Sequence, residues 1–304
     1  MNLDGKCFYN EASASKLGWS PDWFIPGHEN FDYSLLVAIR EFQKAHGLTA
    51  DGLCGPTTYR RINTARQALG EHRKHDLKNS SEFVYYRGQP IPIKWDKVTT
   101  HLDSDCLKLT GRKKSMNGKK RNIKYFVTHW DVCLSSESCV KVLNRRNLSV
   151  HFCIDNDGTI HQLCDLNDIA YHAGGSHNSH CIGVEISNAY YPKYQSWYKR
   201  HGYGERPMIT DAECHGHKMK PFMDFYPVQI DALKALYLAC HEGLGIPLEA
   251  PKTKWAVDPD CQKKKFRGFC SHFHLTRGKI DCAGLDIEKL LKEIKNDPLY
   301  CSDR

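Results

Sequence analysis

The sequence predicts an α/β domain with a mixed central sheet flanked by helices, preceded by a small all-α module. Two observations support this prediction. Between residues 125 and 245, short apolar segments typical of strands alternate with helical segments, which is the pattern of a sheet covered by helices. Nearer the N-terminus, YSLLVAIREFQKAHGL (33–48) has apolar residues three apart, as in an amphipathic helix.

The N-terminal segment has the capping and turn residues of a compact helical module. The apolar face of the 33–48 helix consists of Leu36, Ile39, Phe42 and Ala45. Gly47 follows its last turn as a C-cap. The next stretch, TADGLCGPTTYRRI (49–62), has two turn signals, DG and GP, and a short helix at 57–62. We therefore expect a helical module over 1–66, a polar linker over 67–81 and a second domain over 82–304.

The second domain begins with a hairpin, because FVYYRGQPIPIKW (83–95) turns at Gly88 and its prolines indicate an edge strand. KYFVTHW (124–130) predicts a strand and ESCVKVLNRR (137–146) a helix. SVHFCIDNDGTIHQLCD (149–165) predicts a hairpin that turns at NDG, and CIGVEISN (181–188) a buried strand. PVQIDALKALYLACHEGLGIP (227–247) predicts an amphipathic helix that starts at Pro227 and ends at its glycines.

Composition limits the class of protein. No apolar run reaches the roughly 18 residues of a transmembrane helix. The first residues lack the basic and apolar regions of a secretory signal, so we expect synthesis in the cytoplasm. In a reducing compartment the 14 cysteines are thiols or metal ligands. They form no CxxC pair, which argues against a structural zinc module of four cysteines.

The net charge of +8 indicates an acidic partner without identifying it. Two basic runs, GRKKSMNGKKR (111–121) and CQKKKFR (261–267), carry much of the charge. Basic runs can bind nucleic acid, but these runs lack the interleaved aromatic residues of a stacking platform. We interpret the two runs as solvated loops; as a binding partner, an anionic polymer such as a bacterial envelope fits them as well as nucleic acid does.

The stretch HFHLTRGKIDC (272–282) is rich in metal-binding side chains. Reactive groups gather at the ends of strands in open α/β sheets, and two predicted strands bring His129 and Glu185 to such ends. Together with His272 and Cys282, His129 gives three ligands with one open position, as catalytic zinc requires. Glu185 is then a candidate general base.

Two families share these motifs. AIREFQKAHGLTADGLCGPTTYRRI (38–62) resembles the peptidoglycan-binding type 1 repeat, a three-helix wall-binding module. FVTHW, SVHFCIDNDGTIHQLCD, IAYHAGGSHNSHCIGVEISN and HFHLTRGKIDCAG, taken in order, resemble the type 2 N-acetylmuramoyl-L-alanine amidases, which include the peptidoglycan recognition proteins. This second resemblance covers roughly residues 82–298. It implies a Zn²⁺ cofactor and an amidase that cleaves the bond between N-acetylmuramic acid and L-alanine.

The resemblance implies His129 as the first zinc ligand and leaves the later two open. His272 follows a small residue and precedes an aliphatic one, as in the family, so we favour it over His274. DCAG fits the family's Cys-Pro-Gly and makes Cys282 the third ligand, whereas KID fits its Lys-x-Asp form and makes it Asp281. Because thiolate is the softer donor, Cys282 is preferred.

The resemblance also implies roles for other residues. Glu185 serves as the base, because Val150 stands where some relatives have a tyrosine, and Lys279 stabilises the oxyanion. His172 and Asn178 shape the substrate groove. The spacing of Cys133 and Cys139 matches that of a disulfide in animal members of the family, although the absence of a secretory signal favours free thiols here.

The sequence therefore predicts a monomeric, endolysin-like zinc amidase that binds and hydrolyses peptidoglycan and neither binds nucleic acid nor inserts into a membrane. Its route to the wall is release at lysis or non-classical export. The alternative is a non-catalytic recognition protein. Glu185 and Cys282 argue against that alternative, since a pure binder needs neither.

Overall fold

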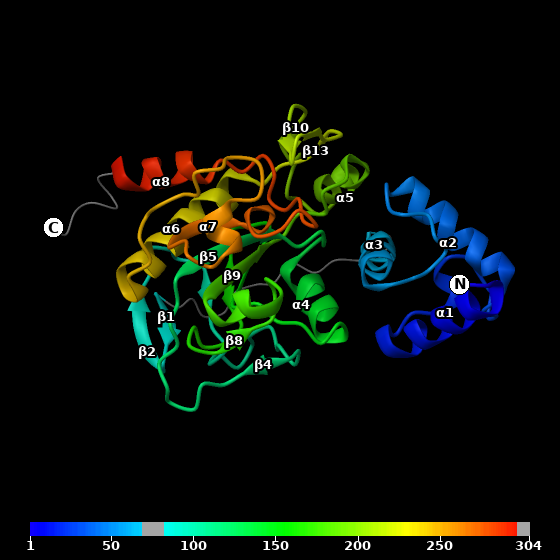
Figure 1. Ribbon diagram of the computed structural model, residues 1–304, viewed down its shortest axis with the longest axis horizontal. Helices are drawn as coiled ribbons and strands as arrows, with labels where there is room; N and C mark the ends of the chain where they lie inside the picture. The colour runs from blue at the N-terminus through cyan, green and yellow to red at the C-terminus, as the bar shows by residue number, and fades with distance from the viewer. Residues whose placement is uncertain (69–81, 297–304) are drawn as a thin grey trace.

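The computed structural model describes residues 1–68 and 82–296 (Figure 1). Most of the predicted linker, residues 69–81, lies outside the described residues. The N-terminal helices pack together at one end of the molecule, and α3 is the helix of this group that lies nearest the sheet. Among the described helices, none has both the length and the apolar content of a membrane-spanning segment.

The N-terminal module contains three α-helices, as predicted: α1 (Leu3–Leu17), α2 (Tyr33–Ala45) and α3 (Pro56–Gln67). The first two begin at side-chain caps, with Asn2 accepting from Gly5 and Asp32 from Leu35. Pro56 occupies the first turn of α3, where its missing N–H removes no helical hydrogen bond.

The buried face of α2 differs from the predicted one. Its buried residues are Leu35, Leu36, Ile39 and Gln43. Ala45 is exposed and Phe42 only partly buried. Gln43 belongs to the buried face because its side-chain amide forms hydrogen bonds with the turn that follows the helix. The amide donates to Leu53 O at 3.0 Å and accepts from Gly52 N at 2.9 Å.

The second domain is built on a mixed six-stranded sheet of order β14-β5-β9-β6-β7-β3. Only the β6–β7 pair is antiparallel, and this pair is the hairpin predicted around NDG. These strands are β3 (Val98–Thr99), β5 (Tyr125–Trp130), β6 (Phe152–Ile154), β7 (Ile160–Gln162), β9 (Cys181–Ile186) and β14 (Gly268–Ser271). The predicted α/β fold class with a mixed sheet is confirmed.

Helices cover both faces of this sheet. On one face α6 (Pro227–Leu244) packs with α8 (Ile287–Asn296) beside it, and Tyr237 of α6 hydrogen-bonds Thr128 of β5. On the other face lies α4 (Ser136–Arg145), whose Val140 and Leu143 share an apolar cluster with Cys153 of β6. Because side chains alternate along a strand, the residues of β5 on either side of Thr128 point away from α6.

The remaining elements are short and lie around the sheet. The predicted 83–95 hairpin is formed by β1 (Phe83–Tyr86) and β2 (Gln89–Pro92). The other strands are β4 (Lys113–Lys114), β8 (Ile169–Ala170), β10 (Met208–Ile209), β11 (Glu213–Cys214), β12 (His217–Lys218) and β13 (Phe222–Met223), and the other helices are α5 (Gln195–Arg200) and α7 (Pro259–Gln262).

The Gln43 network predicts a stability effect. Gln43 is 2% exposed, and Gln43→Ala leaves the buried Gly52 N–H without its acceptor. We expect the free energy of unfolding to fall by about 2 kcal/mol, measured by urea denaturation followed through the fluorescence of the nearby tryptophans. The matched control is Lys44→Ala on the exposed side of the same helix. This substitution should change the free energy of unfolding by less than about 0.5 kcal/mol. Equal losses in the two variants would contradict the assignment.

Candidate functional site

Two neighbouring parallel strands bring the first two site residues together. β5 and β9 pair so that His129 lies directly opposite Glu185 near their carboxyl ends. Thr128 faces α6. Because successive side chains of a strand alternate between the two faces, the side chains of His129 and of Glu185 opposite it point to the other face. They are 2% and 7% exposed. The predicted convergence of these residues at the strand ends therefore follows from the register of one strand pair.

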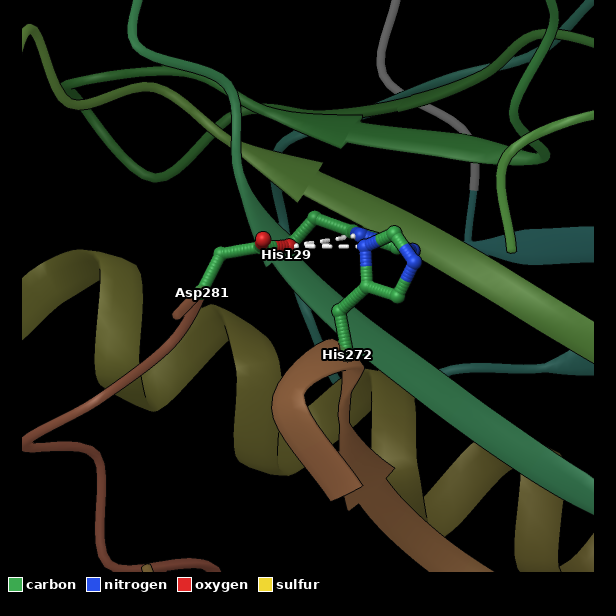
Figure 2. A group of neighbouring side chains, drawn as sticks. All are labelled: His129, His272 and Asp281. Carbon is green, nitrogen blue, oxygen red and sulfur yellow. Dashed lines mark hydrogen bonds and ion pairs between the residues drawn. The ribbon is translucent and has the colours of Figure 1, made fainter. Parts of the chain in front are cut away.

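The 272–282 stretch approaches from the other side of β5. β14 pairs with β5 in parallel and leads into a short 3₁₀ turn, His272–His274. The loop that follows returns with Asp281. Its Oδ2 lies 2.9 Å from Nδ1 of His129 and 3.1 Å from Nδ1 of His272 (Figure 2). Segments about 150 residues apart thus meet at one carboxylate oxygen.

His129, His272 and Asp281 fit a divalent metal ion. Within the described residues, their three ligand atoms lie within 4.8 Å of one another, and all three side chains are buried. Tetrahedral zinc with bonds of about 2.1 Å places neighbouring donors roughly 3.4 Å apart, close to the spacings of Asp281 from the two imidazoles. Two imidazoles and one carboxylate are common zinc ligands, and they leave a fourth position open.

The electrostatics of the cluster favour the metal-binding forms of its side chains. Burial, and then the neighbouring His272, lower the pKa of His129 to about 4, so its imidazole is neutral at pH 7. Burial alone raises the pKa of Asp281, but the two histidines outweigh burial and hold the pKa well below its usual range. A neutral imidazole and an ionised carboxylate are the forms that bind a metal.

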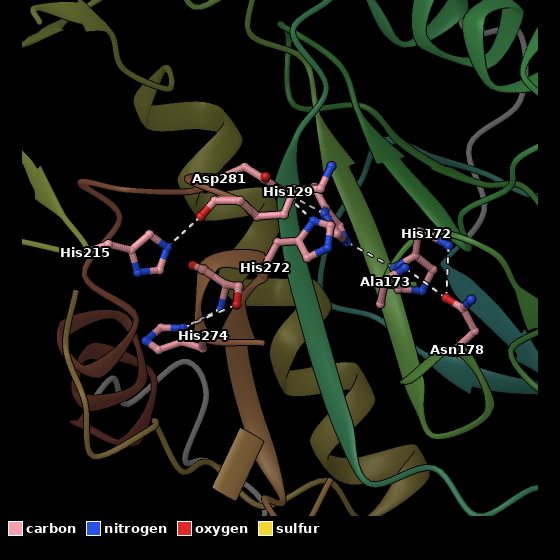
Figure 3. A network of polar contacts seen from close by, with 10 residues as sticks. His129, His172, Ala173, Asn178, His215, His272, His274 and Asp281 are labelled. Atoms are coloured by element: carbon pink, nitrogen blue, oxygen red, sulfur yellow. Dashed lines mark hydrogen bonds and ion pairs between the residues drawn. The ribbon is translucent and has the colours of Figure 1, made fainter. Parts of the chain in front are cut away.

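Cys282 and His274 lie away from this cluster. Cys282 is fully buried in the apolar core beneath the sheet, among the residues that pack around α6. His274 turns back on its own segment, where its Nδ1 accepts from Ser271 N at 3.0 Å (Figure 3). The three side chains that the structure brings together are therefore His129, His272 and Asp281.

His172 and Asn178 support the site from the loop and the short 3₁₀ turn that follow β8. Nδ1 of His172 lies 3.0 Å from Nε2 of His129, on the side of that ring away from Asp281 (Figure 3). Such a partner fixes the orientation of a metal-binding imidazole. Asn178 does not line the cavity around the cluster. Its Oδ1 accepts from the backbone N–H groups of His172 and Ala173, so it holds the His172 loop in place.

Glu185 is the unpaired carboxylate of the site. Its Oε2 is buried and has no hydrogen-bond partner in the described part of the chain. Burial raises the pKa of Glu185 to about 8. A carboxyl group with a pKa near neutrality and an unused oxygen is suited to accept and release a proton.

An open cavity of about 410 Å³ surrounds these groups. Lys279 is exposed at its edge, and His215 bonds the backbone carbonyl of Lys279 at 2.8 Å. One stretch of the lining comes from the N-terminal module: Thr57, Arg60 and Arg61 of α3. This contribution is not predictable from the sequence. No local pattern relates residue 60 to residue 185.

A second group lies near the site. Asp131, Cys133 and Cys139 have ligand atoms within 4.8 Å of one another. The Asp131 carboxylate already accepts from the backbone N–H groups of Cys133 and Asn188, which makes it part of the turn after β5. Cys133 and Cys139 are free thiols, as are the other cysteines among residues 1–68 and 82–296.

Comparison with known families confirms both resemblances. Residues 119–250 match the sequence model of the N-acetylmuramoyl-L-alanine amidase family, and residues 15–62 match that of the putative peptidoglycan binding domain. The curated proteins contain no match to this sequence.

Solved structures that resemble this chain include one described as a hydrolase and two described as amidases. The hydrolase AmiA of Staphylococcus aureus has 11% identity and a TM-score of 0.38, with 64% of this chain and 78% of that chain covered. The endolysin LysCS of Clostridium intestinale has 15% identity and a TM-score of 0.36, with 66% and 97% covered. The N-acetylmuramyl-L-alanine amidase AmiD of E. coli has 21% identity and a TM-score of 0.30, with 44% and 49% covered.

Proposed function

We propose that this chain, with an N-acetylmuramoyl-L-alanine amidase segment (119–250) behind a putative peptidoglycan binding segment (15–62), is a zinc-dependent amidase of the bacterial cell wall. Its reaction is hydrolysis of the amide bond between N-acetylmuramic acid and the L-alanine of the stem peptide. The observation that carries the proposal is the convergence of His129, His272 and Asp281 beside the unpaired carboxylate of Glu185 in one open cavity.

We assign the metal ligands as His129, His272 and Asp281, and thus favour Asp281 over Cys282. A bound zinc ion supplies Lewis-acid chemistry, which polarises a carbonyl group and activates water. His172 keeps the His129 ring in its orientation through the bond between Nδ1 and Nε2. Cys282 contributes to packing.

Glu185 and Lys279 carry the remaining chemical roles. Glu185 accepts the proton of the attacking water and transfers it to the nitrogen of the leaving amine. Lys279 lies at the edge of the cavity with its ammonium exposed, where it stabilises the negative charge that develops on the carbonyl oxygen. One such donor contributes on the order of 3 kcal/mol to a transition state.

The helical module anchors the enzyme to its insoluble substrate. A tethered second contact raises the effective concentration of the catalytic site at the polymer without changing the chemistry. We propose boundaries of 1–66 for the module and 82–304 for the catalytic domain. The wall is the site of action whichever route brings the protein there.

The ligand assignment predicts the outcome of two neighbouring substitutions. Asp281→Ala removes a donor from the cluster, so zinc affinity should fall by more than the 10- to 100-fold typical of losing an orienting partner. Cys282→Ala removes only a buried thiol and should retain stoichiometric zinc. Metal content after dialysis, with circular dichroism to check folding, measures both. Zinc retained by Asp281→Ala and lost by Cys282→Ala would reverse the assignment.

The role of Glu185 predicts a pH profile. A general base acts when unprotonated, so kcat/KM should rise with pH through the pKa of Glu185. Burial raises that pKa from 4.5 to about 8, and a cation bound nearby lowers it, which places the midpoint between these values. Glu185→Gln should reduce kcat by roughly 10²- to 10⁴-fold and remove this limb. New amino groups released from purified wall provide the assay.

The same assay separates the amidase from a non-catalytic recognition protein. A protein that binds zinc and sediments with the wall, yet releases no amino groups at any pH, is a binder and refutes the proposed reaction. A Glu185→Gln variant as active as the unaltered chain refutes only the role of Glu185.

A further inference from the structure

The helical module and the catalytic domain are packed against each other. Thr64 of α3 donates its hydroxyl to Val132 O at 2.9 Å, and the Tyr191 hydroxyl of the catalytic domain donates to His46 O. One apolar cluster includes residues of both parts, among them Leu17 and Tyr59 of the module and Val140 of α4. α3 is therefore held in a fixed position beside the cavity.

The cavity that contains the catalytic groups has a surplus of positive charge. Its cationic lining residues are Arg60, Arg61, Arg146, Arg277 and Lys279, whereas its carboxylates are Glu185 and Asp281. Asp281 is already bonded to two histidines. Five cations against one uncommitted carboxylate produce a positive potential that attracts an anionic group into the cavity.

Arg60 is one of two arginines that the module adds to this lining, and the charge of Glu185 across the cavity attracts it. Its Nε is buried without a hydrogen-bond partner in the described part of the chain. Arg61 also has buried donors without a partner there, its Nε and Nη1, but its guanidinium lies 4.9 Å from the Tyr191 ring. Arg66, farther along α3, lies 4.8 Å from the Trp23 ring. A buried guanidinium N–H that lacks an acceptor is costly unless a bound ligand supplies one.

Arg146, at the end of α4, has the same property. Its Nε is also buried and unpartnered among residues 1–68 and 82–296. It lines the same cavity as Arg60, so the module and the catalytic domain both present guanidinium groups with unused donors. Two like charges in one cavity repel each other, and an anion between or beside them relieves this repulsion.

The proposed substrate has an anionic group of the right kind. The ligand named for the AmiD structure contains L-Ala-D-γ-Glu-L-Lys. Its glutamate is linked through the γ-carboxyl, which leaves the α-carboxylate free, one residue from the scissile bond. Guanidinium groups bind carboxylates through two parallel N–H···O bonds. A neutral α-carboxamide at this position cannot form a charged pair.

We propose that Arg60, supported by Arg146, binds the free α-carboxylate of the γ-linked glutamate of the stem peptide. The helical module then has a second role, because its α3 supplies a specificity-determining residue to the catalytic cleft. This inference rests on the proposed amidase function for the identity of the substrate. It goes beyond that function because it makes a helix of the wall-binding module responsible for discriminating between acidic and amidated stem peptides.

The test compares two muramyl peptides with the zinc-loaded full chain: N-acetylmuramoyl-L-Ala-D-γ-Glu-L-Lys and its α-carboxamide. We expect kcat/KM to favour the carboxylate form by on the order of 10- to 100-fold, the range of a charge-assisted pair. Arg60→Gln should remove most of this preference, mainly by raising KM for the carboxylate form. Arg60→Lys, which keeps the charge, should retain part of it.

Arg66→Gln is the matched control, because it makes the same change on the same helix outside the cavity; it should leave the preference intact. The inference is overturned if the unaltered chain cleaves both peptides equally, or if Arg60→Gln slows both by the same factor. If the unaltered chain cleaves neither, the proposed function fails. Calorimetric binding of the L-Ala-D-γ-Glu-L-Lys tripeptide and its carboxamide to the same variants then decides the role of Arg60 independently.

Discussion

The parallel pairing of β5 with β9 is the constraint on which the site depends. The hydrogen bonds between these strands place His129 opposite Glu185, and the two-residue alternation of side chains sends both to the face away from α6. A register slip of one residue would place Ile186 or Val184 at the site and turn the carboxylate of Glu185 into the apolar core. Because that core packs fully against α6, such a slip is strongly disfavoured, and the geometry of the proposed chemistry follows from ordinary packing.

Much of this arrangement could be predicted from the sequence. Apolar runs of strand length ended at His129 and Glu185, and turn residues marked the hairpins and the helical module. The face of α2 was less predictable, since Gln43 is buried for its hydrogen bonds and not for its hydrophobicity. β14 was not anticipated, although its pairing with β5 is what delivers His272.

The identity of the third donor illustrates where sequence reasoning stops. Asp281 and Cys282 are adjacent, and both residue types bind zinc. The two residues lie in a turn, where the side chain of Asp281 reaches the histidines and that of Cys282 enters the core. The softness of sulfur as a zinc ligand favours Cys282 over Asp281, but the path of the chain decides which of the two side chains reaches His129 and His272. His172 lines the cavity, but its contact with the His129 ring could not be predicted, because it depends on where the loop after β8 lies relative to β5.

The apolar cluster shared by the module and α4 has an evolutionary consequence. Enzymes of modular construction diversify when recombination exchanges one anchoring unit for another, and this is easiest when units touch little. Here an exchange would uncover Val140 and Leu143 of α4 and remove the partners of Tyr191 and Val132. The two parts are therefore expected to be inherited together, with changes on one side of their boundary compensated on the other.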